Sequence, residues 1–321
     1  MTRLVIHQPK NFESRRYRYY NLVFDAITAK LRESFDVMEC GYYKYANQGY
    51  SPTLLLHNAT RYNDTNIQLL ECEMIIENYE TKEIKVLSAS DDLTGAILNF
   101  KGNPLLTKTL VAQFDRKKIH SHLPDENDQK KICPWVYFPT NDYDFDAIEN
   151  RRHNKTILGT VNQKFYFRGS SLECRRIVAG FNPELFTGGG PIGGFESYTD
   201  ELLNYRLGFS IAGRGEFCYR DIEYMAMGVP YIRFEYNSEM AEPLVPDFHY
   251  VSVPRPPDAP NDRDLRPEHA PLIEARFLEV RNDIDYLNFI ANNALDYYNK
   301  HVKMVGCVNH TLKLLEIDKW L

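Results

Sequence analysis

The sequence contains no pair of cysteines at C-x-x-C spacing, although it has six cysteines in 321 residues. Zinc ribbons and thioredoxin-type redox sites need closely paired cysteines, so neither kind of site is predicted. Isolated cysteines are typical of buried thiols in a reducing compartment. The six lie far apart, at Cys40, Cys72, Cys133, Cys174, Cys218 and Cys307.

Long hydrophobic runs are also missing. No segment reaches the roughly 18 apolar residues of a transmembrane helix. Residues 1–17 have no apolar core after their charged positions, so no secretory signal peptide is predicted. We therefore expect either a soluble, cytoplasmic protein with no membrane span, of microbial or viral origin, or a trimmed form of a longer chain.

Basic residues are fewer than acidic residues. The formal net charge is −6 and no basic stripe stands out, which argues against nucleic acid as a partner. Apolar residues make up 43% of the chain, which is enough to fill hydrophobic cores. A chain of this length is expected to form about two domains.

Diagnostic metal and phosphate motifs are absent too. His120 and His122 lie two apart, with no third ligand at a recognisable spacing. The Asp-x-Asp-x-Asp series at 142–146 lacks the glycine and the closing glutamate of an EF-hand. The glycine-rich stretch 187–197 matches neither G-x-x-x-x-G-K-[ST] nor a G-x-G-x-x-G that follows a strand. We predict no metal site and interpret 187–197 as a loop.

The first half of the chain alternates between strand and helix patterns. Residues 4–7 and 35–40 are apolar strand patterns, and residues 15–34 between them carry apolar side chains at helical spacing. A β-α-β opening of this kind is typical of a Rossmann-like sheet. Three further strands are predicted, at 54–57, 68–79 and 85–88.

The most informative stretch is 207–234. An apolar strand is followed by a Gly-Arg-Gly turn, a helix over 220–227 that Gly228 ends, and a second apolar strand. This pattern predicts a βαβ unit. Open α/β sheets bind ligands at the carboxyl ends of their strands, which is where this turn and this helix start would fall.

The charged residues of this stretch suit an anionic ligand. Arg214, next to Gly215, precedes a helix start, where the helix dipole and free amides also favour anions. Arg220 and Glu223 are three residues apart, so they share one helix face. Together they could hold a diphosphate and a ribose diol. A surface ion pair is an equally good interpretation of the same spacing.

The run RDIEYMAMGVPYI, which begins at Arg220, resembles the donor-binding unit of GT-B glycosyltransferases, especially the exostosin-like and CAP10-like families. The resemblance implies that Arg220 contacts the phosphates of a sugar donor and that Glu223 contacts its ribose hydroxyls. The chain departs from the pattern at Tyr219, usually Ser, and at Tyr224, usually Ala. Tyr219 could still donate its hydroxyl to a phosphate, and Glu235, after the second strand, could contact the sugar.

A second segment carries the same resemblance. Residues 164–181, KFYFRGSSLECRRIVAGF, predict a strand, a turn of small residues and a helix. They resemble the Phe-x-Gly-Ser…Arg element that opens the donor domain of the same families. The resemblance implies that Arg168, Gly169 and Ser170 line the phosphate site and that Arg175 reaches it.

The general base is predicted in the first half of the chain. An inverting transfer needs a carboxylate or a histidine that takes the proton of the acceptor hydroxyl. Asp91 and Asp92 follow a predicted strand and precede a helical run, so they are the first candidates. His57 is the second and Asp115 the third. Aspartates in such places are also common N-caps, which is the alternative interpretation.

The last third of the chain is predicted to be mainly helical. Residues 254–271 are rich in Pro, Asp and Arg and are interpreted as an ordered surface excursion. Residues 272–304 have a continuous helical stripe, and 310–321 form a last helix.

We expect an α/β protein of GT-B type, with two Rossmann-like domains that face each other across a cleft. The predicted domains are an acceptor-side domain at 1–150, a nucleotide-sugar-binding domain at 151–302, and a terminal helix at 303–321 that crosses back to the first domain. The resemblance covers 163–253 and is only architectural in the first half.

The reaction that the resemblance implies is an inverting transfer of a hexose or pentose from a nucleotide sugar to a hydroxyl of a glycan or protein acceptor. The donor would be UDP-linked, for example UDP-glucose or UDP-xylose, and no metal or other cofactor would be obligatory. Two alternatives stay open. One is a non-catalytic protein of the same fold that binds nucleotide sugars or carbohydrates, and the other is a phosphosugar epimerase.

Overall fold

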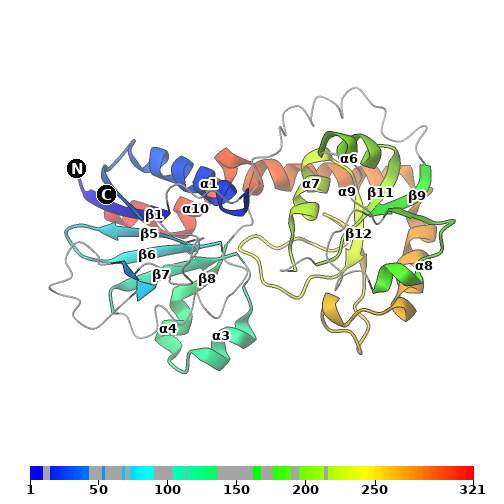
Figure 1. Cartoon of the computed structure of the whole chain (residues 1–321), viewed down its shortest axis with the longest axis horizontal. Helices are drawn as coiled ribbons and strands as arrows, with labels where there is room; N and C mark the ends of the chain where they lie inside the picture. The colour runs from blue at the N-terminus through cyan, green and yellow to red at the C-terminus, as the bar shows by residue number, and fades with distance from the viewer. Residues whose placement is uncertain are drawn as a thin grey trace. The chain divides into compact units, whose positions relative to one another are not determined.

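The computed structural model describes residues 1–9, 15–42, 53–54, 67–68, 73–89, 104–112, 114–135, 162–167, 176–188, 195–212 and 216–321. The chain forms two compact units. Unit 1 consists of Met1–Asn141, Glu239–Ala241 and Met304–Leu321, and unit 2 consists of Asp142–Ser238 and Glu242–Lys303. Both units combine a sheet with helices, which confirms the predicted α/β class (Figure 1).

Unit 1 contains a mixed sheet of six strands in the order β2-β1-β5-β6-β7-β8. The neighbours of β5 both run antiparallel to it, whereas the pairs β1/β2, β6/β7 and β7/β8 are parallel. The predicted β-α-β opening is confirmed, because β1 and β2 flank helix α1 and pair in parallel. The bounds are β1 (Arg3–Pro9), α1 (Arg15–Leu31), β2 (Asp36–Tyr42), β5 (Glu73–Asn78), β6 (Ile84–Ser88), β7 (Leu106–Val111) and β8 (Ile132–Pro134). A separate pair of short strands consists of β3 (Thr53–Leu54) and β4 (Ile67–Gln68).

Helices pack against this sheet in two places (Figure 1). The last helix, predicted over 310–321, begins earlier, as α10 (Met304–Leu314), and a 3-10 turn, Ile317–Trp320, follows it. Helices α1 and α10 share one core with Leu4, Ile6 and Trp135, and the Trp135 Nε1 donates to Thr311 Oγ1 of α10 at 2.8 Å. Helices α3 (Arg116–His122) and α4 (Glu126–Lys131) lie on the other side, with a smaller core.

Unit 2 contains a parallel sheet of five strands in the order β10-β9-β11-β12-β13. Its first strand along the chain, β9, lies between the second and the third. In doubly wound sheets the strand order reverses at such a place, here between β9 and β11, and a crevice for ligands opens at the carboxyl ends of the two strands. The strands are β9 (Asn162–Phe167), β10 (Phe186–Gly188), β11 (Tyr205–Phe209), β12 (Tyr231–Phe234) and β13 (Val251–Val253).

The two faces of this sheet differ in composition. One face presents phenylalanine and aliphatic side chains, such as Phe165 and Phe209, which pack with Phe277 of α8 (Ala270–Val280). The other face presents tyrosines, and Tyr224 of α7 (Tyr219–Met227) and Tyr198 of α6 (Phe195–Leu202) pack there. Figure 1 shows α7 and α8 on either side of β12.

The helical character predicted for 272–304 is confirmed, and the structure shows a break that divides the stretch. Helix α8 ends at Val280, and α9 (Ile284–Tyr297) starts afresh after Asp283. The Asp283 carboxylate accepts a hydrogen bond from the Tyr286 amide at 3.0 Å and so caps α9. The apolar stripe of the sequence continues across the break, which is why periodicity alone did not reveal it.

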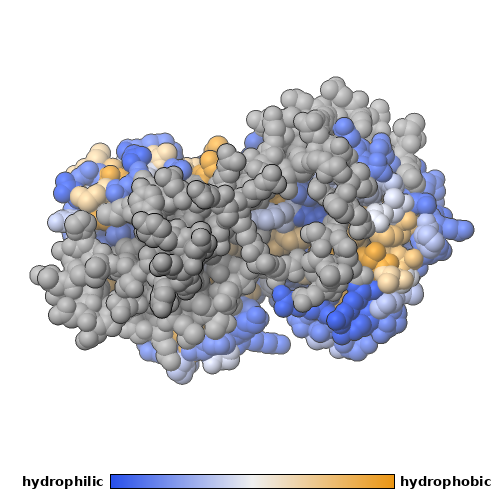
Figure 2. All heavy atoms as spheres, in the orientation of Figure 1, coloured by the Kyte–Doolittle hydropathy of each residue, from blue (hydrophilic) through white to orange (hydrophobic). Residues whose placement is uncertain are grey.

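On the face drawn in Figure 2, the described part of the surface is mainly hydrophilic. Figure 2 shows blue atoms over most of the coloured part of the face in view, with apolar atoms in small groups. Among the described helices, none combines the length and the apolar character that crossing a bilayer requires.

One glycine explains how a large side chain fits at position 224. A Cβ atom on Gly208 of β11 would lie 2.7 Å from the ring of Tyr224. The Tyr224 hydroxyl donates to the Phe209 carbonyl at 3.0 Å. The large side chain therefore fits only because the strand beneath it has no side chain at this point.

We expect Gly208→Ala to lower the free energy of unfolding by about 1–3 kcal/mol, because the methyl group overpacks against the Tyr224 ring. Urea denaturation would measure the change. In a Tyr224→Ala background the ring is gone, so the same glycine substitution should then cost nothing. An equal cost in both backgrounds would show that the strand, rather than the ring, excludes the methyl group.

Candidate anion-binding site

The candidate site lies in unit 2, at the carboxyl ends of β9 and β11, where the strand order reverses. Helix α7 begins shortly after β11 and points its amino terminus toward this edge of the sheet. The predicted helix, its left-handed Gly228 cap with φ of 57°, and the following strand are all confirmed. A helix amino terminus at a switch point favours a bound anion, because free amides and the helix dipole both face it.

Arg220, the second residue of α7, connects the two strand ends. Its Nη1 donates to the Ile211 carbonyl, just beyond β11, at 2.7 Å. Its guanidinium carbon lies 4.7 Å from the ring centroid of Phe167, the last residue of β9. These contacts place a half-buried positive charge at the switch point, beside the helix amino terminus.

Glu223 lies one turn further along α7 and is buried, with 6% of its surface exposed. It approaches Tyr198 of α6. Burial, together with the neighbouring Glu223 carboxylate, raises the pKa of the Tyr198 phenol well above its usual range. Because Arg220 is half-buried and Glu223 is buried, the alternative of a solvent-exposed ion pair is wrong.

Two other predicted donor contacts lie at the same edge. Tyr219 is the first residue of α7 and is half-buried. Glu235 directly follows β12 and is also half-buried. The Glu235 amide donates to the Val253 carbonyl at 3.0 Å, and its own carbonyl accepts from Arg255 Nε at 2.5 Å. The backbone at Glu235 is therefore fixed from two sides.

Most of the remaining predicted site residues lie outside the described residues and stay predictions. On the donor side these are Arg168, Gly169, Ser170, Arg175, Arg214 and Gly215. Among the candidate bases they are His57, Asp91 and Asp92.

Asp115, the third candidate base, is described. Its carboxylate accepts a hydrogen bond from the Lys118 amide at 3.1 Å and caps α3. The N-cap interpretation therefore holds for this residue.

A buried network of charged residues beside the site was missed by the sequence analysis. Asp221 and Arg233 are both fully buried and pair at 3.0 Å. The Asp221 carboxylate also accepts from Ser210 Oγ at 2.6 Å and from the Cys218 amide at 2.7 Å, so it ties α7 to the end of β11. The Tyr236 hydroxyl donates to the same carboxylate at 2.9 Å.

The network continues into the stretch predicted as a surface excursion. Asp262, which is 5% exposed, lies 3.4 Å from Arg233 Nη2 and 2.6 Å from Arg255 Nη1. Arg255 also pairs with Glu216 at 2.6 Å. One signal could have revealed the network. Arg233 stands inside a four-residue strand whose position in a parallel sheet predicts burial, and a buried arginine needs a partner.

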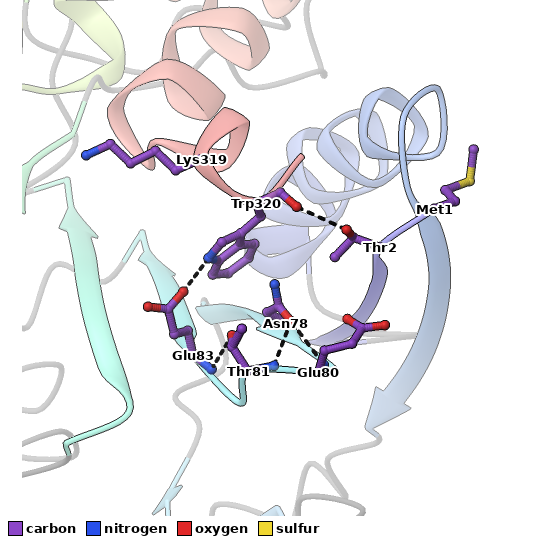
Figure 3. Close-up of a pocket in the computed structure, with 8 residues that line it drawn as sticks. All are labelled: Met1, Thr2, Asn78, Glu80, Thr81, Glu83, Lys319 and Trp320. Carbon is purple, nitrogen blue, oxygen red and sulfur yellow. Dashed lines mark hydrogen bonds between the residues drawn. The ribbon is translucent and has the colours of Figure 1, made fainter.

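A pocket of about 450 Å³ in unit 1 lies elsewhere (Figure 3). It lies where β1 begins, beside the turn between β5 and β6, and therefore at the edge opposite to the carboxyl ends of most strands. Its polar groups bind each other: Trp320 Nε1 donates to Glu83 at 2.5 Å, and Thr2 Oγ1 donates to the Trp320 carbonyl at 3.1 Å. We do not assign it to the candidate site. Its lining residues are Met1, Thr2, Asn78, Glu80, Thr81, Glu83, Lys319 and Trp320.

Comparisons with known proteins give only distant similarities. No protein-family model matches the chain, and no curated protein sequence is significantly similar to it. The resemblance to the exostosin-like and CAP10-like families therefore stays a prediction.

Several solved structures are similar to this chain over most of its length. A glycosyltransferase from Rickettsia africae ESF-5 is 12% identical, with 97% of this chain and 96% of that chain covered and a TM-score of 0.47. Anabaena Alr3699/HepE, solved with UDP and glucose, is 12% identical, with coverage of 98% and 100% and a TM-score of 0.49. Sucrose-phosphate synthase from Thermosynechococcus elongatus is 10% identical, with coverage of 97% and 73% and a TM-score of 0.42.

Proposed function

We propose that the protein is a GT-B-type glycosyltransferase that moves a sugar from a nucleotide sugar, UDP-linked, to a hydroxyl of a glycan or protein acceptor. One observation carries the proposal. Arg220 joins the carboxyl ends of β9 and β11 at a helix amino terminus, which is the arrangement that a doubly wound sheet uses to bind a diphosphate.

The proposed domains are 1–150 and 151–302, with 303–321 returning to the first domain. The division into two compact α/β units supports this arrangement, because the chain after Met304 belongs to unit 1.

In the proposed reaction the acceptor hydroxyl attacks the anomeric carbon while the carbon–oxygen bond to the diphosphate breaks. The hydroxyl proton passes to a general base, for which Asp91, Asp92 and His57 are the candidates, and the nucleoside diphosphate leaves with the electron pair. Arg220 and the first amides of α7 stabilise the charge that develops on the leaving group, as a metal ion does in other enzymes. Glu223 accepts hydrogen bonds from the ribose hydroxyls.

A thermal-shift experiment with UDP, GDP, CMP and dTDP sugars tests the proposal. A ligand that binds only the folded state stabilises it by roughly 2.7 kcal/mol at a hundredfold excess over Kd. We expect a shift with UDP sugars, followed by detectable transfer of the sugar. Absence of any shift in a folded sample would overturn the proposal, and a shift without transfer to any acceptor would favour the non-catalytic binding protein.

A further inference from the structure

Asp262 and Arg220 hold opposite sides of one peptide group. The peptide bond between Ile211 and Ala212 presents its N–H to Asp262 Oδ2, with a nitrogen–oxygen distance of 2.6 Å. The carbonyl of the same peptide accepts from Arg220 Nη1 at 2.7 Å. The orientation of this peptide plane therefore depends on both side chains. A rotation of the plane that weakens the hydrogen bond to Asp262 also moves the Ile211 carbonyl that Arg220 contacts.

Asp262 is itself held firmly. It is 5% exposed, and its second oxygen pairs with Arg255 Nη1 at 2.6 Å. Arg255 is in turn fixed by the Glu216 carboxylate at 2.6 Å and by the Glu235 carbonyl at 2.5 Å. The Asp262 carboxylate therefore cannot rotate freely. If it moved away from the Ala212 amide, a buried charge would lose a hydrogen bond, which has a large cost in free energy.

The hydrogen bonds on the two sides of the peptide also reinforce each other. A carboxylate that accepts from the N–H polarises the peptide and makes its carbonyl a stronger acceptor for a cation. Asp262 thus strengthens the contact that fixes Arg220, although the two residues are 42 positions apart in the sequence.

From these contacts we propose that Asp262 is a positioning residue for Arg220: through the Ile211–Ala212 peptide it aims the guanidinium at the anion that binds at the start of α7. The proposal rests on the function proposed above and extends it. The Pro-rich stretch 254–264 then contributes to the donor site through Arg220, without contacting the donor itself.

The test measures the affinity for UDP of folded protein by calorimetry, in the wild type, in Asp262→Ala and in Asp262→Asn. We expect Asp262→Ala to bind UDP about tenfold more weakly, because a small misplacement of a binding group carries a large penalty. Asparagine keeps an oxygen for the Ala212 amide but loses the charge, so Asp262→Asn should lie between the two. It also serves alone if the alanine variant does not fold. Asp258→Ala is the matched control, since this aspartate of the same stretch has a side chain that is 76% exposed, and its affinity should not change.

A double-mutant cycle separates positioning from general destabilisation. In an Arg220→Ala background, where UDP affinity is measured at high ligand concentration, Asp262→Ala should change the affinity less than about twofold. An equal loss in both backgrounds, or an unchanged affinity in Asp262→Ala and Asp262→Asn, would overturn this inference alone. A wild-type protein that does not bind UDP would overturn the proposed function as well.

Discussion

Arg220→Ala is expected to weaken the binding of UDP at least about a hundredfold. A hydrogen bond between charged groups contributes about 1.5–3 kcal/mol, and the guanidinium can reach a diphosphate with more than one N–H. A loss of about 3 kcal/mol corresponds to roughly a hundredfold in Kd. Titration of UDP by calorimetry measures the effect. The Arg220 contacts with Ile211 and Phe167 make the charge stationary, so little of this energy is spent on ordering the side chain.

Two companion variants make the Arg220 result specific. Arg220→Lys keeps the positive charge but loses the planar fork that donates to two acceptors, so its affinity should fall between wild type and Arg220→Ala. Arg176→Ala removes a solvent-exposed arginine from the same unit and should leave the affinity unchanged. If Arg220→Ala binds UDP as the wild type does, the anion site lies elsewhere and the proposed function loses the observation on which it depends.

Local signals were sufficient for the elements nearest the site. The strand–helix–strand order of 207–234 could be predicted because each boundary has its own chemical mark, such as Gly228, whose φ of 57° few other residues adopt readily. The position of Arg220 at the helix start follows from the same marks. The same marks do not predict that Arg220 faces β9 as well as β11, because the pairing between these strands is set by the fold as a whole.

Contacts between distant parts of the chain could not be predicted. Asp262 meets the Ala212 amide across 50 residues, and nothing in the Pro-rich sequence around it indicates a buried carboxylate. The fit of Tyr224 over Gly208 is another example. Neither residue is unusual by itself. Only the packing of α7 on β11 shows that the Tyr224 ring leaves no room for a side chain at position 208. Sequence periodicity describes which face of an element is buried, but not which side chain lies opposite.

The buried pair of Arg233 and Asp221 should dominate the stability of unit 2. Burial alone would lower the pKa of the Arg233 guanidinium, but Tyr236, Asp221 and Asp262 outweigh this and hold the pKa well above its ordinary value. The charge is therefore permanent, and its neighbours are arranged around it. The guanidinium carbon lies 3.4 Å from the ring centroid of Tyr236, and Nε donates to the Phe234 carbonyl at 3.0 Å.

We expect Arg233→Met to lower the free energy of unfolding by about 3–5 kcal/mol, measured by urea denaturation, because it leaves a buried carboxylate without its counter-charge. The control Lys300→Met removes an ion pair whose partners are both more than half exposed, Lys300 and Asp296, and should cost less than about 1 kcal/mol.

A second substitution distinguishes an uncompensated charge from lost packing. Asp221→Asn removes the charge that Arg233→Met leaves behind, so the double variant should be more stable than the sum of the two single losses predicts, by at least about 1 kcal/mol. Additive losses would mean that the two side chains stabilise the unit independently, through their hydrogen bonds to Ser210, Cys218 and Phe234. Recovery in the double variant would instead show that unit 2 depends on charge balance at this edge of the sheet. The same balance holds the start of α7 in place, so the stability of the unit and the geometry of the anion site should be lost together.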